Sequence, residues 1–228
     1  LVRVVNPGVD LQQFKPGDKI AARNELAIPA HAQVLLFVGR IQPLKAPDVL
    51  VRAAAEMVAR NPELRHSLVV AICGGPSGSG LERPESLIEL ARDLGISEIV
   101  RFEPPTNRER LANWYRAADL TIVPSHSESF GLVALESQAS GTPVIAANVG
   151  GLPTAVHRGE GGVLVDGHDP KNWATAISDT LANVDLLVSL REGGLKHASN
   201  FGWDATTDKL LEVYEEAVAH NLAKRAMA

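Results

Sequence analysis

The chain has 228 residues, of which 45% are hydrophobic and 21% charged, and its formal net charge is −5. These values suit one large α/β domain, or one and a fraction, and an acidic balance without a basic tract argues against nucleic acid as the main partner. No apolar run reaches the length of a transmembrane segment. The single cysteine, Cys73, excludes an internal disulfide and favours a reducing, cytoplasmic location. Because the chain starts without Met in a turn-rich stretch, we expect it to be the C-terminal part of a longer protein.

Short apolar runs alternate with longer amphipathic segments along the chain. Residues 1–17 predict a connector that contains a short first strand. Continuous apolar runs predict buried strands at 34–38, 68–73, 99–102, 120–123, 144–147 and 162–165. Periodic segments predict helices at 18–28, 47–60, 84–94, 108–117, 131–140, 171–183, 185–199 and 204–224. This alternation with short connections predicts an α/β fold, a Rossmann-like, doubly wound parallel sheet with additional C-terminal helices.

Polar and glycine-rich residues recur where the predicted strands end. They occupy five loops, Gly39–Lys45, Gly74–Gly80, Pro104–Asn107, Ser125–Gly131 and Gly150–Thr154. Because open parallel sheets bind ligands at the carboxyl ends of their strands, we expect these loops to line one ligand site. Arg40 and Lys45 lie in the first loop, and two cations at this place match a diphosphate.

The segment 125–141 indicates what that ligand is. Its helix is apolar on most faces, so the one charged residue within it, Glu136, needs a hydrogen-bonding partner. Glu128 lies eight residues earlier, in the loop before the helix. Between the two, Phe130, Gly131 and Leu132 place free backbone N–H groups at the helix N-terminus, where a phosphate binds well. A carboxylate, an anion cradle and a second carboxylate in a line match the sugar, diphosphate and ribose of a nucleotide sugar.

These residues resemble a known family. Four motifs, at residues 39–45, 128–136, 141–145 and 150–151, are similar to the C-terminal, donor-binding Rossmann domain of the retaining GT-B glycosyltransferases of family 4. The resemblance covers almost the whole chain, and its Glu-x7-Glu pattern is specific. Loops 39–45, 74–78 and 124–131 are most similar to the branch of the family that transfers N-acetylglucosamine from UDP-GlcNAc to inositol 3-phosphate in mycothiol biosynthesis.

The resemblance implies which residues carry the transfer. Arg40 and Lys45 would bind the diphosphate of the UDP-GlcNAc donor and stabilise the leaving UDP. Glu128 would bind hydroxyls of the sugar. These three side chains are the expected catalytic residues of the family's donor domain.

Other residues are implied to bind the nucleotide sugar or a metal. Glu136 would accept hydrogen bonds from the ribose, and Thr106 would meet uracil through its backbone. The backbone N–H groups expected to contact sugar and phosphate are those of Phe130, Gly131 and Leu132. The chemistry needs no cofactor, but the family suggests a structural Mg²⁺, held mostly by backbone oxygens. Its implied ligands are Tyr115, Arg116, Ala118 and Thr142.

The resemblance also divides the chain into parts. Residues 1–17 would be a linker, 18–200 the donor-binding domain and 201–228 a C-terminal crossover helix. The N-terminal, acceptor-binding Rossmann domain of a GT-B enzyme is absent, so we expect this chain to bind a UDP-sugar weakly without transferring it. Whether the protein forms a homodimer stays open. Two alternatives also stay open: a family 4 enzyme with another acceptor (a sugar phosphate, lipid or polysaccharide), and a non-catalytic nucleotide-binding module.

Overall fold

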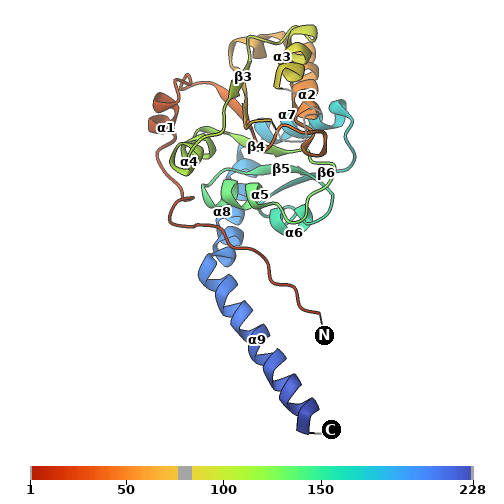
Figure 1. Cartoon of the computed structure of the whole chain (residues 1–228). Coiled ribbons are helices and arrows are strands. Elements are labelled where there is room, and N and C mark those ends of the chain that lie inside the picture. Colours follow the sequence, from red (N-terminus) through yellow and green to blue (C-terminus); the bar gives the residue numbers. More distant parts are fainter. Residues whose placement is uncertain (1, 77–83, 227–228) are drawn as a thin grey trace.

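A computed structural model describes residues 2–76 and 84–226 (Figure 1). Six parallel strands form one sheet in the order β3-β2-β1-β4-β5-β6, which is the predicted doubly wound arrangement. The strands are β1 (Gln33–Val38), β2 (Leu68–Cys73), β3 (Val100–Glu103), β4 (Leu120–Val123), β5 (Val144–Ala147) and β6 (Gly162–Val165). Nine α-helices are found in the described residues: α1 (Lys19–Glu25), α2 (Pro47–Arg60), α3 (Pro84–Asp93), α4 (Arg108–Ala117), α5 (Leu132–Ala139), α6 (Leu152–Val156), α7 (Pro170–Ala182), α8 (Val184–Ala198) and α9 (Trp203–Ala226). The described residues also include three short 3₁₀ segments, Pro43–Lys45, Pro62–His66 and Ser199–Phe201.

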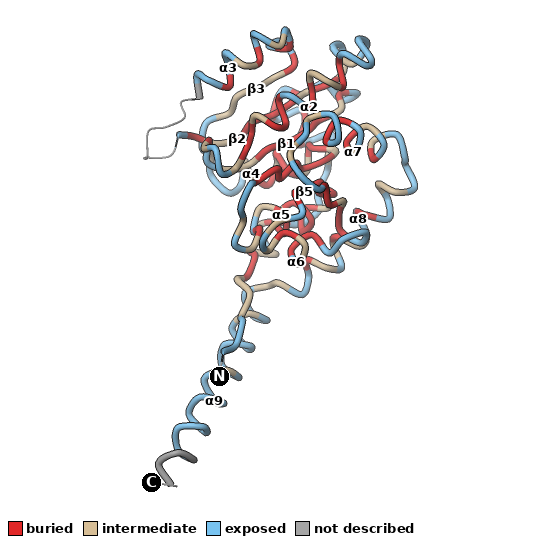
Figure 2. Tube along the Cα trace, turned by 90° about the vertical axis from the view of Figure 1, so that its right-hand side faces the viewer, coloured by how far each residue is buried: buried red, intermediate tan, exposed pale blue. Residues whose placement is uncertain are grey.

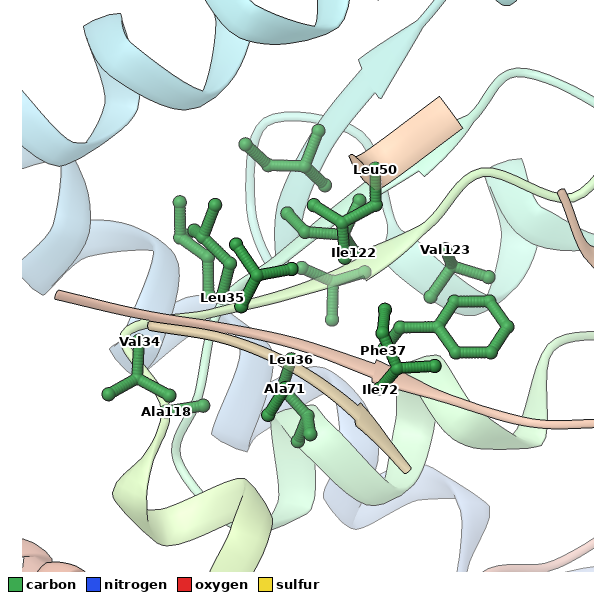
Figure 3. Close-up of a cluster of buried hydrophobic side chains, with 14 of the residues drawn as sticks. Val34, Leu35, Leu36, Phe37, Leu50, Ala71, Ile72, Ala118, Ile122 and Val123 are labelled. Carbon is green, nitrogen blue, oxygen red and sulfur yellow. The ribbon is translucent and has the colours of Figure 1, made fainter. Parts of the chain in front are cut away.

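The centre of the sheet is buried on both faces, because helices cover both sides of it. β1 pairs with β2 along six residues and with β4 through Leu35, which lies opposite Leu120. In Figure 3, Leu35 lies on the side of the sheet that also holds Leu50 of α2, whereas Val34 lies on the opposite side, near Ala118. Helix α2 contacts both α3 and α7, and α4, α5 and α8 form a second group in which α5 joins the other two. Figure 1 shows these two groups on opposite sides of the sheet.

Local signals in the sequence fix the starts of several helices. The side chains of Asp18, Asn107 and Asp169 accept hydrogen bonds from backbone N–H groups in the first turns of α1, α4 and α7. Proline opens α2 and α7, where its missing N–H costs nothing. Helix α1 ends at Glu25 rather than at residue 28, because Ala27 turns the backbone to a positive φ of 53°.

Two expectations about the connecting segments were wrong. Residues 2–17 form no strand; the segment lies along the start of α9, where Val9 makes an isolated bridge to Gly202 and its N–H donates to the Phe201 carbonyl at 2.7 Å. Among residues 2–76 and 84–226, no strand lies beside this segment to complete the hydrogen bonds that a strand there would need. The loop expected at Gly150–Thr154 instead leads into the short helix α6, and the Ser77–Gly80 part of the predicted Gly74–Gly80 loop lies outside the described residues.

The last helix, α9, points away from the body of the molecule (Figure 1) and is exposed along most of its described length (Figure 2). Among its exposed apolar side chains are Leu211, Tyr214, Val218 and Leu222, whose exposures lie between 53% and 61%. The N-terminal segment is tied to it by an ion pair between Arg3 and Glu216 at 2.9 Å. In the described part of the chain no helix combines the length and hydropathy that crossing a bilayer requires.

Candidate functional site

The carboxyl edge of the sheet is closed by loops that touch through their backbones. Gly74, at the end of β2, lies so close to the loop after β1 that a Cβ atom on it would be 1.8 Å from the Gly39 carbonyl oxygen. The Ile41 N–H donates to the Gly75 carbonyl at 2.9 Å. Gly74 is therefore required by close approach, and these contacts hold the first two predicted ligand loops side by side.

The loops after β4 and β5 are joined in the same way. The Gly151 N–H donates to the Glu128 carbonyl at 2.9 Å. A Cβ atom on Gly150 would lie 2.0 Å from that same carbonyl oxygen, and one on Gly151 would lie 2.5 Å from the Cα of Phe130. Only glycines leave room for the Ser125–Gly131 loop to lie on this turn, so the turn fixes the backbone that carries Glu128.

Lys45 and Glu128 form an ion pair across two of these loops. The Lys45 Nζ atom lies 2.5 Å from Glu128 Oε2, and the side chains are only 21% and 15% exposed. The residues are 83 positions apart in the sequence, and the fold brings them together as predicted for groups at one sheet edge. The pair keeps the lysine charge and the carboxylate in fixed positions beside the start of α5.

The first backbone N–H groups of α5, which begins shortly after Glu128, are free. Gly131 caps the helix with φ of 109°, and a Cβ atom there would lie 2.8 Å from Leu152 of α6. Within the part of the chain that the structure describes, the backbone N–H groups of Gly131, Leu132 and Val133 have no hydrogen-bond acceptor. This is the predicted anion-binding end of a helix, where the N–H groups and the helix dipole both favour negative charge.

The side chains at this helix start differ in their surroundings. Phe130 is partly buried, and its ring packs 5.8 Å from the ring of Phe201. Leu132 is exposed. Neither side chain has a polar group, so their contribution to a ligand site is through the backbone, as expected.

Glu136 sits one turn further along α5 and is held by a buried tyrosine. The Tyr115 hydroxyl donates to Glu136 Oε2 at 2.8 Å, and Tyr115 is fully buried. Burial raises the pKa of the Glu136 carboxyl, while the Tyr115 hydrogen bond and the Arg108 charge act in the opposite direction. Burial and the neighbouring Glu136 charge also raise the pKa of Tyr115, so its hydroxyl stays a donor. The predicted need of Glu136 for a hydrogen-bonding partner is thus met.

Arg40 and Thr106 line a separate pocket of about 260 Å³ at the same edge. Its walls include Cys73, Gly74 and Pro105. The Arg40 side chain is exposed, and it makes no hydrogen bond or ion pair with any described residue. Cys73 is buried, and burial raises the pKa of its thiol, which suits core packing rather than a reactive group.

The four residues implied as metal ligands meet at the opposite, amino edge of the sheet. The Thr142 hydroxyl donates to the Tyr115 carbonyl at 2.6 Å, and Arg116, Ala118 and Thr142 line a pocket of about 160 Å³. Carbonyl oxygens at the end of α4 and a threonine hydroxyl are the oxygen donors that Mg²⁺ accepts, and a helix C-terminus favours a cation. However, three cationic residues, Lys19, Arg116 and Arg191, line the same pocket against one carboxylate, that of Asp119. The donor atoms therefore fit the metal in type, but the charge around them disfavours tight binding.

Two features of the site were missed by sequence reasoning. The Tyr115 hydroxyl was not expected to serve Glu136, although a tyrosine on an otherwise buried helix face must find a partner for its hydroxyl. His168 lies in the turn after β6, and its Nε2 atom is 3.2 Å from the Ser125 carbonyl. Its ring is 4.0 Å from that of His126, which is exposed, as expected for a loop histidine.

Comparison with known proteins agrees with this geometry. Residues 18–197 match the family model described as "Glycosyl transferases group 1". The chain is 63% identical over 217 residues to a "D-inositol 3-phosphate glycosyltransferase" of Thermobispora bispora, a match that covers 95% of this chain and 51% of the relative. The chain therefore spans about half the length of the curated relatives it matches.

Solved structures share the fold. Sucrose-phosphate synthase from Thermosynechococcus elongatus superposes with a TM-score of 0.84 at 32% identity, over 96% of this chain and 53% of that one. HepE of Anabaena, in complex with UDP, superposes with a TM-score of 0.84 over 94% of this chain and 57% of that one. At 22% identity, the second likeness concerns the fold alone.

Proposed function

The chain belongs to the group 1 glycosyltransferases, and on that premise we propose that it is the donor-binding half of a retaining enzyme that uses UDP-GlcNAc. The observation that carries the proposal is the Lys45–Glu128 pair beside the free N–H groups of α5, with the Tyr115-bound Glu136 further along the same helix. A cation, an anion cradle and two carboxylates at one edge of the sheet form the set of contacts that a nucleoside diphosphate sugar needs.

The structure supports an order for the parts of the donor. The base would enter the pocket of Arg40 and Thr106, where the loops after β1, β2 and β3 meet. The ribose would hydrogen-bond to Glu136, and the diphosphate would lie on the N–H groups of α5 with Lys45 and Arg40 beside it. The sugar would then reach Glu128. Each assignment agrees with the role that the family resemblance implies.

The chemistry that these groups provide is electrostatic. When the bond between the sugar and UDP breaks, negative charge grows on the diphosphate, and fixed donors aimed at it lower the barrier. Lys45, Arg40 and the α5 N-terminus supply that charge stabilisation. Glu128 is engaged by Lys45, which suits a residue that accepts hydrogen bonds from sugar hydroxyls better than one that attacks the sugar as a nucleophile.

A structural Mg²⁺ is a lesser part of the proposal. Tyr115, Arg116 and Ala118 would hold it through backbone oxygens and Thr142 through its hydroxyl, at the sheet edge opposite the donor site. When bound, the ion would supply only positive charge that ties the end of α4 to the turn before β5. No step of the transfer depends on it.

The acceptor and its domain lie outside the described site. We propose inositol 3-phosphate as the acceptor because the Thermobispora relative, 63% identical, is named for it. Another acceptor within the same family stays the alternative, because the groups described above face the donor. An N-terminal Rossmann domain would cover the exposed apolar face of α9, which includes Tyr214 and Val218. We expect this chain alone to bind the donor without transferring the sugar.

Calorimetric titration of this chain tests the proposal. We expect heat and a thermal shift with UDP and with UDP-GlcNAc, and weaker binding of ADP at equal concentration. Glu136→Ala should weaken UDP binding by about 1–3 kcal/mol, the cost of losing hydrogen bonds to a charged group. Lys45→Ala should weaken it as well, whereas the matched control Lys15→Ala, at an exposed site away from the loops, should not. No heat and no thermal shift at about 1 mM UDP, a concentration at which even weak binding is detected, would overturn the proposal.

A further inference from the structure

We propose that Tyr115 is the positioning residue of the ribose subsite: its hydroxyl holds one oxygen of the Glu136 carboxylate, so that the other oxygen faces the two ribose hydroxyls and selects ribose over 2′-deoxyribose. This inference rests on the proposed function, because it takes the ligand of Glu136 to be the ribose of a nucleotide. It assigns to the Tyr115 side chain a role distinct from that of the Tyr115 carbonyl at the other edge of the sheet.

The tyrosine itself cannot move freely. Tyr115 lies in α4 with 0% of its surface exposed, and its ring packs edge-on against Phe14, with centroids 5.7 Å apart and an interplanar angle of 76°. A buried tyrosine hydroxyl needs a hydrogen-bond partner, and in the described residues its acceptor is Glu136 Oε2 at 2.8 Å. Rigid packing on one side and a short hydrogen bond on the other therefore fix where the hydroxyl points.

The second carboxylate oxygen is left for a ligand. In the described part of the chain, Glu136 Oε1 makes no hydrogen bond, and no cation lies within ion-pair distance of the carboxylate. Glu136 Oε1 is also not one of the buried polar atoms that lack a partner, so it still reaches solvent. An ionised carboxylate with one oxygen held and the other open is an acceptor that a pair of neighbouring hydroxyl donors complements.

Fixing one oxygen changes what the carboxylate can recognise. A free carboxylate can rotate and satisfy a single hydroxyl in many ways. With Oε2 held by Tyr115, Oε1 points in one fixed direction. A ligand then binds most tightly when both of its hydroxyls donate hydrogen bonds to Oε1. Removal of the 2′-hydroxyl then leaves part of the acceptor unpaired, and unpaired buried groups are the basis of strong discrimination.

The test compares UDP with 2′-deoxy-UDP in calorimetric titrations of four chains: the wild type, Tyr115→Phe, Glu136→Ala and the double variant. We expect the wild type to bind UDP at least about 10-fold tighter than 2′-deoxy-UDP, the range of one good hydrogen bond to a charged group. Tyr115→Phe should lower the affinity for UDP by about 3- to 10-fold and that for 2′-deoxy-UDP by less, so that the ratio falls. In the Glu136→Ala chain, adding Tyr115→Phe should change UDP affinity by less than about twofold, because the two residues act as a unit.

Two controls separate this role from a packing effect. Phe14→Leu loosens the ring contact of Tyr115 but keeps the hydroxyl, so it should lower the thermal stability and leave the UDP to 2′-deoxy-UDP ratio unchanged. Glu136→Gln tests the geometry without altering Tyr115. If Tyr115 fixes the amide oxygen, the amide nitrogen faces the ligand and donates where the carboxylate oxygen accepted. The preference for UDP over 2′-deoxy-2′-fluoro-UDP, whose fluorine cannot donate, should then fall well below that of the wild type.

The outcomes distinguish the inference from the function on which it rests. If the wild-type chain binds no UDP, the proposed function fails. If it binds UDP but Tyr115→Phe keeps the full preference over 2′-deoxy-UDP, the function stands and the role of Tyr115 is overturned. If Tyr115→Phe does not fold, Glu136→Gln decides, because a retained preference for UDP over 2′-deoxy-2′-fluoro-UDP there would mean that the side chain turns freely to present its oxygen, and would overturn the role of Tyr115.

Discussion

Replacing Gly150 by alanine tests whether the turn after β5 positions Glu128. Gly150 has φ of 53°, and a Cβ atom on it would lie 2.0 Å from the Glu128 carbonyl oxygen. Side-chain Cβ atoms do not approach other heavy atoms closer than 3.0 Å, so the Glu128 loop and the turn must separate by about 1 Å. That shift breaks the backbone contact between the two loops, including the hydrogen bond from Gly151 to Glu128.

Two effects of this substitution add up. The left-handed backbone conformation costs an alanine about 1–2 kcal/mol of folding stability. The displaced loop also weakens binding of the sugar, because a shift of about 1 Å in a positioned group can cost about 100-fold in the activity that depends on it. We expect Gly150→Ala to lower the affinity for UDP-GlcNAc by about 10- to 100-fold, and more than it lowers the affinity for UDP, since Glu128 is the proposed sugar ligand.

Gly95→Ala is the matched control. Gly95 has a similar φ of 65°, but nothing lies within 4 Å of the position that its Cβ would take. It should therefore show the backbone strain alone, as a fall of about 1 kcal/mol in unfolding free energy with unchanged binding. Urea unfolding and calorimetric titration measure both quantities. If Gly150→Ala binds UDP-GlcNAc as tightly as Gly95→Ala does, the turn does not position Glu128, and the reasoning is refuted.

Three further predictions concern other parts of the molecule. Lys45→Ala leaves the Glu128 carboxylate without its cation and should lower the unfolding free energy by about 1–3 kcal/mol in urea melts. Adding Glu128→Gln should restore much of this loss, because the neutral amide needs no cation. Full stability of Lys45→Ala would contradict this prediction. Burial lowers the pKa of His197 from 6.5, so the unfolded chain takes up a proton first as the pH falls, and stability is lost from about pH 6.5 down to the folded pKa. His197→Gln should therefore lose less thermal stability between pH 7.5 and pH 5.5 than the wild type does. Equal losses in the two chains would mean that His197 does not cause this pH dependence. Val218→Glu on the exposed face of α9 should change the melting temperature of this chain by less than about 2 °C, as expected for an exposed substitution, and a larger drop would mean that this face is covered.

Elements with strong local signals could be predicted from the sequence alone. The strands Leu68–Cys73, Val144–Ala147 and Gly162–Val165 were predicted with the bounds that the structure has, because each is a short apolar run between turn residues. Helix α2 was also predicted residue for residue, since Pro47 opens it and Pro62 stands just beyond its end. The parallel direction of the strands followed from the alternation of strands and helices.

Contacts between distant segments could not be predicted in the same way. Lys45 and Glu128 were each expected to face the ligand, but their mutual ion pair depends on how two loops meet across the sheet edge. The hydrogen bond between Tyr115 and Glu136 joins two helices, so no spacing in the sequence encodes it. The same holds for Gly150, which the sequence places only in a glycine-rich loop, whereas the structure shows a tight backbone contact.

These contacts bear on how much of the function resides in this chain. Apart from the exposed Arg40, the side chains that would bind the donor are fixed by contacts made entirely within this chain: glycine turns hold the loops, Lys45 holds Glu128, and Tyr115 holds Glu136. A site whose side chains are already oriented loses little entropy on binding, so donor affinity should not require a second domain to organise it. The apolar face of α9, in contrast, has nothing in the described residues to cover it. A second domain placed there would therefore raise the stability of α9 and bring the acceptor, while leaving the affinity for UDP nearly unchanged.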